Sequence, residues 1–190
     1  SGYSEPNWRV FFNRNEIFWF SQRDNWGHLY LYDLETGKLK HQITKGDWNF
    51  KEYVKIDHDN EIIYFIGSGR EQGNPYHEYL YKINFDGSGL VCLTPESGHH
   101  RITLSPCEKF FVDSYSSVET PPKTVVRNIN GKIIADLGQQ DISGLKETGW
   151  QQPELIKEKG RDGTTDIYGI LYKPSHFDPN KTYPIINNNY

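Results

Sequence analysis

The residues best suited to chemistry are seven histidines, of which only His99 and His100 are adjacent. Successive side chains of a strand point to opposite faces of a sheet, so this pair would not converge on one metal ion. No cysteine or carboxylate stands beside the pair at the spacing of a zinc site. We therefore predict a structural or solvated role for His99 and His100, and we expect no metal and no cofactor.

The sequence contains no motif that would supply a catalytic nucleophile. The sequence holds no Gly-x-Ser-x-Gly elbow, the turn that carries the serine of α/β-hydrolases. Residues 57–61 alternate acidic and polar side chains, but they lack the sixth-position glycine and the distal glutamate of a calcium loop. Residues 67–69 follow a strand-like run without opening a helix, so they do not predict a phosphate loop. Residue types alone predict no catalytic residue here and leave the substrate-binding residues unknown.

The elements around these residues are short strands. Residues 53–56, 61–66, 78–85 and 90–94 are rich in β-branched and aromatic side chains, and turns with glycine or proline separate them. The turn at residues 86–89 contains two glycines, which accept the positive φ of a tight hairpin. Together these runs predict one four-stranded antiparallel meander.

That meander recurs along the chain. Residues 17–21 and 109–114 resemble residues 62–66, at shifts of 45 and 48 residues. Four strands at such a period predict propeller blades, which bury their faces only against neighbouring blades. The alternative is an ordinary β-sandwich in which the similarity between the segments arises by chance.

The repeats define a domain organisation. We expect a partial β-propeller over residues 1–138, with units at about 8–48, 49–98 and 99–137. We predict that residues 139–152 form a linker. In it, Asp141 is expected to cap a short helix and Gly149 to end it. Beyond it, the strand-like runs 154–158 and 166–172 predict a different hairpin, and Ile185 is expected to begin a further strand.

Composition supports an all-β fold and excludes some functions. Aromatic residues make up 15% of the chain, which favours strands. The net charge of −4, with acidic and basic residues interspersed, argues against nucleic acid as a partner. No apolar run has the length of a membrane span. The chain has no methionine, so we expect a processed or excised piece of a longer protein.

The two cysteines, Cys92 and Cys107, fall in or beside strands of different predicted units. This placement does not resemble a disulfide framework. We expect free thiols that are buried or semi-buried, and cysteine usage therefore does not fix the cellular compartment.

The final forty residues carry the most specific pattern. Its parts are Asp162-Gly163, Tyr168-Gly169-Ile170-Leu171-Tyr172-Lys173-Pro174, Phe177-Asp178-Pro179 and Lys181-x-Tyr183-Pro184-Ile185-Ile186. This pattern closely resembles the dipeptidyl peptidase IV branch of the prolyl oligopeptidase family, at the entry into the catalytic α/β-hydrolase domain. Residues 27–32, 43–48 and 80–95 look like the closing blades of that family's propeller. The resemblance covers about residues 5–190 and implies that residues 153–190 are the first strands of the hydrolase domain.

The resemblance also implies a function. The parent would be a serine exopeptidase that acts on peptides and releases N-terminal dipeptides with Pro or Ala second, by acyl transfer to serine. This chain alone would be inactive, because it lacks the nucleophile. The paired glutamates with which the family holds the substrate's amino group have no match here. By resemblance, the parent would be periplasmic, secreted or at the cell surface. An open arc of three blades leaves an unpaired side, so we also expect a homo-oligomer.

One site residue follows from the resemblance. In the family, a tyrosine shortly after the Tyr-Pro-apolar-apolar stretch donates its hydroxyl to the oxyanion of the tetrahedral intermediate. Residues 183–186 precede Tyr190 at the matching distance, so Tyr190 is the candidate oxyanion donor of the parent. The alternative is a terminal tyrosine that merely packs or frays, which the three asparagines at 187–189 favour.

Two other functions stay open. A non-catalytic propeller that binds a protein or glycan would explain the repeats, although not the hydrolase-like pattern of residues 162–190. An acyl-aminoacyl peptidase or oligopeptidase of the same superfamily would explain both.

Overall fold

The computed structural model describes residues 7–188 of the chain. The chain divides into two compact units between Gln139 and Gln140. The assignment of residues 139–152 as a linker and of 153–190 as hydrolase strands stays a prediction.

The first unit begins with a four-stranded antiparallel meander in the order β1-β2-β3-β4. Its strands are β1 (Arg9–Phe11), β2 (Glu16–Ser21), β3 (His28–Asp33) and β4 (Leu39–Gln42). The single-turn 3-10 helix η1 (Phe12–Arg14) joins β1 to β2. Asn15 follows it with a φ of +52°, a left-handed conformation that asparagine tolerates better than most residues.

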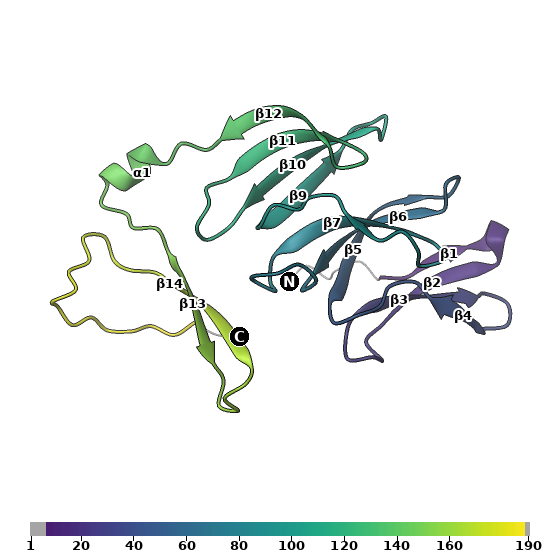
Figure 1. The fold of residues 1–190 in the computed structure, drawn as a ribbon, viewed down its shortest axis with the longest axis horizontal. Helices are drawn as coiled ribbons and strands as arrows, with labels where there is room; N and C mark the ends of the chain where they lie inside the picture. The colour runs from purple at the N-terminus through teal and green to yellow at the C-terminus, as the bar shows by residue number, and fades with distance from the viewer. Residues whose placement is uncertain (1–6, 189–190) are drawn as a thin grey trace. The chain divides into compact units, whose positions relative to one another are not determined.

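Two more meanders follow in the same unit (Figure 1). The second consists of β5 (Asn49–Asp57), β6 (Ile62–Ser68), β7 (Glu78–Asn84) and β8 (Val91–Cys92). The third consists of β9 (His99–Leu104), β10 (Phe110–Ser116), β11 (Lys123–Asn128) and β12 (Ile133–Gln139). The predicted fold class, an all-β partial propeller of three four-stranded antiparallel blades, is confirmed.

The second and third meanders are less separate than the repeats predict. A parallel pairing of Glu78 with His99 links β7 to β9, so that the two meanders form one eight-stranded sheet. Strand β8 is also shorter than the predicted run 90–94. The outer strand stops early because the Thr94 hydroxyl, rather than a backbone carbonyl, accepts the hydrogen bond of the Leu80 amide at 2.8 Å.

Successive side chains of a strand point to opposite faces, so the second meander has an apolar core on each of its two faces. Ile63 and Phe65 of β6 pack into a cluster shared with the first meander. Tyr64 and Ile66 point the other way, into a cluster that includes Phe111 of the third meander. Each large side chain that is fully buried contributes about 1.5–3 kcal/mol, so the neighbouring meanders stabilise one another.

The second unit contains α1 (Ser143–Glu147) and the antiparallel pair β13 (Glu154–Lys159) and β14 (Asp166–Leu171). The predicted cap Asp141 is misplaced by one residue. The N-cap position is Ile142, and Asp141 instead accepts hydrogen bonds from the amide and hydroxyl of Ser143 at 2.9 and 3.0 Å. Gly149 follows the helix with a φ of +80°, as a helix-ending glycine does.

The strand predicted to begin at Ile185 is wrong for the described residues. No strand follows β14 up to residue 188. Ile185 and Ile186 are 92% and 91% exposed. A strand forms only when a neighbour satisfies its backbone groups, and no described strand pairs with this segment.

Candidate functional site

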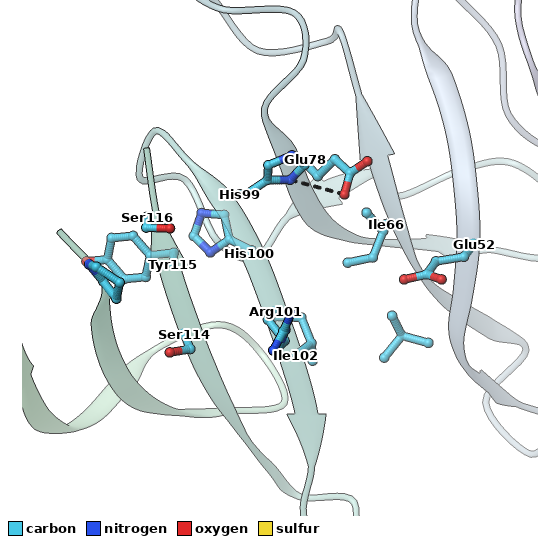
Figure 2. A pocket seen from close by; sticks show the side chains of 12 residues that line it. Glu52, Ile66, Glu78, His99, His100, Arg101, Ile102, Ser114, Tyr115 and Ser116 are labelled. Atoms are coloured by element: carbon cyan, nitrogen blue, oxygen red, sulfur yellow. Dashed lines mark ion pairs between the residues drawn. The ribbon is translucent and has the colours of Figure 1, made fainter. Parts of the chain in front are cut away.

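The second and third meanders line a cavity of about 630 Å³ (Figure 2). Its lining comes from β5, β6 and β7 of one meander and from β9 and β10 of the next. Clefts of roughly 300–1,000 Å³ hold small ligands in proteins. The cavity is therefore the candidate site in the part of the chain that the structure describes.

One wall of the cavity is apolar and extends the core between the two meanders. Val54, Ile66 and Ile102 line the cavity, and each also belongs to or packs against that core. Glu52 pairs with Ile66 across β5 and β6, so both side chains lie on the same face of the sheet. Figure 2 shows Glu52 and Ile66 on the same side of the cavity, across from β9.

At the rim, a histidine of the third meander contacts a carboxylate of the second. His99 Nδ1 lies 3.2 Å from Glu78 Oε2, next to the backbone pairing of the same two residues. His100, the next residue, is 6% exposed and turns to the opposite face. The two histidines therefore diverge: His99 is exposed to solvent and His100 is buried.

Behind His100 lies a buried network of ionisable groups. Asp113 accepts hydrogen bonds from His100 Nδ1 at 2.7 Å and from Arg127 Nε at 2.9 Å. Arg127 also donates to the Glu96 carboxylate at 2.6 Å and to the Gly131 carbonyl at 3.0 Å. Asp113 is completely buried and Arg127 nearly so. A buried charge is tolerated only where partners satisfy it, and these groups satisfy one another.

The network occupies both ring nitrogens of His100. The Nε2 atom lies 2.8 Å from the Glu96 carbonyl, which is an acceptor, and Nδ1 faces the Asp113 carboxylate. The Glu96 carbonyl can only accept a hydrogen bond, so Nε2 donates to it, and Nδ1 is engaged by the carboxylate. His100 therefore has no free nitrogen to act as a general base, and it positions the cavity wall instead.

Other polar groups around the cavity are unpaired within the described part of the chain. Glu52 and Arg101 are exposed, and among residues 7–188 neither these two side chains nor the hydroxyls of Tyr115 and Ser116 make a hydrogen bond or ion pair with another residue. Tyr115 is only 9% exposed, and this burial raises the pKa of its phenol. The neighbouring Ser114 differs, because its hydroxyl lies 2.7 Å from that of Thr124.

Sequence reasoning singled out His99 and His100 but missed the rest of this site. Asp113 and Arg127 stand in the sequence at positions that alternate with the apolar residues Phe111, Tyr115 and Val125 on one face of β10 and β11. That pattern is a usable signal for a buried ion pair. The predicted oxyanion donor, Tyr190, lies outside the described residues, so its role stays a prediction.

Both cysteines are free thiols. Cys92 is half-buried, and this burial raises its pKa to about 11. Cys107 is exposed rather than buried or semi-buried, because it lies in the turn between β9 and β10. The hydroxyl of Ser105 lies 3.4 Å from its sulfur and lowers the pKa of this thiol.

Two kinds of feature are absent from the described part of the chain. Residues 7–188 hold no group of three or more histidine, cysteine or acidic side chains arranged to bind a metal ion. Among the same residues, no helix has the length and apolar character needed to cross a bilayer.

Curated relatives share the sequence pattern over most of the chain. Dipeptidyl peptidase 4 of Trichophyton equinum is 24% identical over 175 residues, which are 87% of this chain and 21% of that protein. Dipeptidyl-aminopeptidase B of Aspergillus niger is 27% identical over 150 residues, or 76% of this chain and 16% of that protein. The chain thus spans about a fifth of the length of these relatives.

A solved structure shares the fold. The crystal structure of Porphyromonas gingivalis dipeptidyl peptidase 4 matches 89% of this chain and 24% of that one, with a TM-score of 0.67 and 24% sequence identity. The family model for the dipeptidyl peptidase IV (DPP IV) N-terminal region matches residues 1–122, which is more than half of the chain. By that match, this chain belongs to the dipeptidyl peptidase IV N-terminal region family.

Proposed function

We propose that this chain is the non-catalytic propeller portion of a serine exopeptidase that releases dipeptides from peptide N-termini, with Pro or Ala as the second residue. The observation that carries the proposal is the match of residues 1–122 to the DPP IV N-terminal region. The relatives named dipeptidyl peptidase 4 and dipeptidyl-aminopeptidase B support it. The serine nucleophile belongs to the rest of the parent, since residues 1–190 contain no elbow motif.

The buried histidines of the blades support a non-catalytic role. His28 Nδ1 lies 3.1 Å from the Thr44 hydroxyl, and its Nε2 lies 2.8 Å from the Gly46 carbonyl. Burial lowers the pKa of His28, so this imidazole is held neutral and tied at both nitrogens. His100 is tied at both nitrogens as well. Neither ring is free to activate a nucleophile, which requires an open nitrogen within hydrogen-bond reach.

The remaining assignments extend the proposal. Residues 153–190 begin the catalytic hydrolase domain, and in the parent Tyr190 donates a hydrogen bond to the oxyanion. The parent acts on peptides as a homo-oligomer. The exposed apolar side chains of the β13–β14 pair, such as Ile167 and Ile170, are consistent with a surface that further protein covers.

Turnover assays on two proteins test the proposal. The purified 190-residue chain should not hydrolyse a Gly-Pro chromogenic substrate, whereas the full-length parent should hydrolyse it and lose activity to a serine-directed phosphonate. Turnover by the short chain that survives repurification and is blocked by the phosphonate contradicts the non-catalytic assignment. A parent with no turnover contradicts the peptidase assignment.

The Tyr190 assignment has its own test in the parent. Tyr190→Phe should lower kcat by about a hundredfold or more with little change in KM, because the hydrogen bond forms only in the transition state. A kcat within about threefold of that of the parent, which is well under 1 kcal/mol of barrier, refutes the oxyanion role. Tyr172→Phe, which removes a hydroxyl from a tyrosine that is 71% exposed, is the matched control.

A further inference from the structure

We propose that the turn between β3 and β4 of the first meander docks onto a further β-meander of the parent, one whose outer strand ends in an apolar residue followed by threonine. The inference rests on the proposed function in one respect, namely that the chain is part of a longer parent. Its evidence is a contact that the chain makes twice between its own meanders and that the first meander is shaped to make once more.

The second meander docks onto the first through a tight turn. Gly87 in the β7–β8 turn has a φ of +84°, and a Cβ added to it would lie 2.8 Å from the Ile43 carbonyl oxygen. Phe85 of the same turn is 3% exposed, and its ring centroid lies 4.8 Å from that of Phe18. His41 Nε2 donates a hydrogen bond to the Phe85 carbonyl at 2.8 Å. Glycine allows the turn to approach a backbone oxygen this closely, and the aromatic ring anchors it.

The third meander docks onto the second in the same way. Gly131 in the β11–β12 turn has a φ of +87°, and an added Cβ would lie 2.5 Å from the Leu93 carbonyl oxygen. Ile129 of this turn packs against the core that contains Leu93. In both contacts the carbonyl belongs to an apolar residue that precedes a threonine.

The threonine ends the outer strand at the docking point. The Thr44 hydroxyl accepts a hydrogen bond from the Leu29 amide at 2.9 Å, and the Thr94 hydroxyl accepts one from the Leu80 amide at 2.8 Å. The hydroxyl replaces a backbone carbonyl in the ladder, so β4 and β8 stop just before the apolar residue of the pair. An apolar residue followed by threonine therefore marks a strand end that accepts the turn of the next meander.

The first meander has a matching turn whose apolar residue lacks such a partner in the described part of the chain. The Leu34 amide donates to the Asn15 carbonyl at 2.9 Å, just as the Phe85 amide donates to the Glu61 carbonyl at 2.8 Å. Leu34 thus takes the position that Phe85 has in the second meander. Leu34 is only partly buried, and it belongs to neither apolar core.

The glycine of this turn is also placed as in the other two. Gly37 precedes Lys38, whose carbonyl accepts a hydrogen bond from the Asp33 amide and closes the turn, just as Gly87 precedes Ser88. The first turn differs only in being one residue longer. Gly37 has a φ of +65°, and within residues 7–188 no atom lies within 4 Å of an added Cβ. The open space leaves room for a strand end of the kind that the other two glycines contact.

The adjoining face and the length of the relatives identify the occupant. Trp19 alternates with Phe18 and Phe20, which face the core, so it lies on the opposite face of β2, where it is 45% exposed. Because this chain spans only about a fifth of its relatives, the parent has room for further meanders. A second copy would not serve, because its own turns occupy both of its apolar-threonine pairs and β12 contains no threonine.

Site-specific photocrosslinking in the full-length parent tests the inference. With p-benzoyl-L-phenylalanine in place of Leu34, irradiation should give an intramolecular crosslink, and mass spectrometry should locate it at an Ile-Thr or Leu-Thr pair upstream of residue 1. The same probe in place of Phe85 is the positive control, because Phe85 contacts the first meander. The probe in place of Tyr76, a loop residue that is 64% exposed, is the negative control and should not reach that pair.

A glycine substitution tests the fit of the turn. Gly37→Asn keeps the left-handed conformation, which asparagine tolerates, but adds a side chain at the docking point. It should change the Tm of the 190-residue chain by less than about 1 °C and lower that of the parent by more than about 2 °C. Gly163→Asn is the matched control, because Gly163 has a φ of +70° and no described atom lies within 4 Å of an added Cβ. It should leave both Tm values unchanged.

The outcomes separate this inference from the proposed function. It is overturned if the probe at position 34 gives no crosslink while the probe at position 85 does, or if the crosslink joins two copies or lies anywhere other than an upstream apolar-threonine pair. It is also overturned if Gly37→Asn affects the parent no more than the short chain. None of these results affects the peptidase assignment, which depends on turnover. A parent that crosslinks as expected but has no turnover keeps this inference and refutes that assignment.

Discussion

Replacing Asp113 with asparagine removes the carboxylate that both His100 and Arg127 contact. Asp113 and Arg127 are almost fully shielded from solvent, and the two hydrogen bonds to Asp113 measure 2.7 and 2.9 Å. An amide accepts through only one oxygen and carries no charge, so Arg127 keeps only the partly exposed Glu96 carboxylate as its counter-charge. Removing one partner of a buried pair costs about 3–5 kcal/mol. For a chain of this size, a loss of that order lowers Tm by about 10 °C.

Urea unfolding followed by tryptophan fluorescence measures this loss directly. Asp47→Asn is the matched control, because Asp47 is exposed and has no hydrogen bond or ion pair among the described residues. The control should stay within about 0.5 kcal/mol of the unaltered chain. A double-mutant cycle with Arg127→Met isolates the coupling, which should exceed about 1 kcal/mol for groups in contact. An Asp113→Asn chain whose stability lies within about 1 kcal/mol of the original refutes the reasoning.

Three further perturbations have defined outcomes. Thr94→Val leaves the buried Leu80 amide without its acceptor and should cost about 1–3 kcal/mol in urea unfolding; an unchanged midpoint contradicts this. Gly131→Ala should destabilise the chain by more than about 1 kcal/mol, because Gly131 has a φ of +87° and an added Cβ would lie 2.5 Å from a backbone oxygen; a neutral effect would show that the turn adjusts. Cys107 should react with iodoacetamide at lower pH than Cys92, because its pKa is lowered while that of Cys92 is raised to about 11; peptide mapping that finds equal rates at about pH 8 refutes this.

The strands were predictable because their signals are local. Runs such as residues 62–66 combine β-branched and aromatic side chains with flanking turns, and they fold as β6 (Ile62–Ser68). The hairpin at residues 86–89 was predictable for the same reason. Its Gly87 has a φ of +84°, a value that glycine adopts readily in tight turns. Local patterns also indicated the β13–β14 pair with nearly the observed bounds.

Long-range features escaped prediction. The link between β7 and β9 depends on one pairing, Glu78 with His99, and no spacing in the sequence specifies it. The strand expected at Ile185 has a strand-like composition, but no described neighbour pairs with it.

The candidate site was the least predictable part. Its residues come from five strands and from the loop at Pro122, and each residue type is ordinary for its position in the sequence. Only the charged residues at inward positions, Asp113 and Arg127, carried a signal, and the sequence did not identify their partners.

The most direct test of the central claim is mass spectrometry of a synthetic peptide after incubation with the full-length parent. The peptide should begin with an Xaa-Pro dipeptide and carry a free amino terminus. The account predicts release of the intact N-terminal dipeptide, and no cleavage of the same peptide when its amino terminus is acetylated. Removal of an acetylated residue, cleavage at internal positions only, or an unprocessed peptide would contradict the dipeptidyl peptidase assignment.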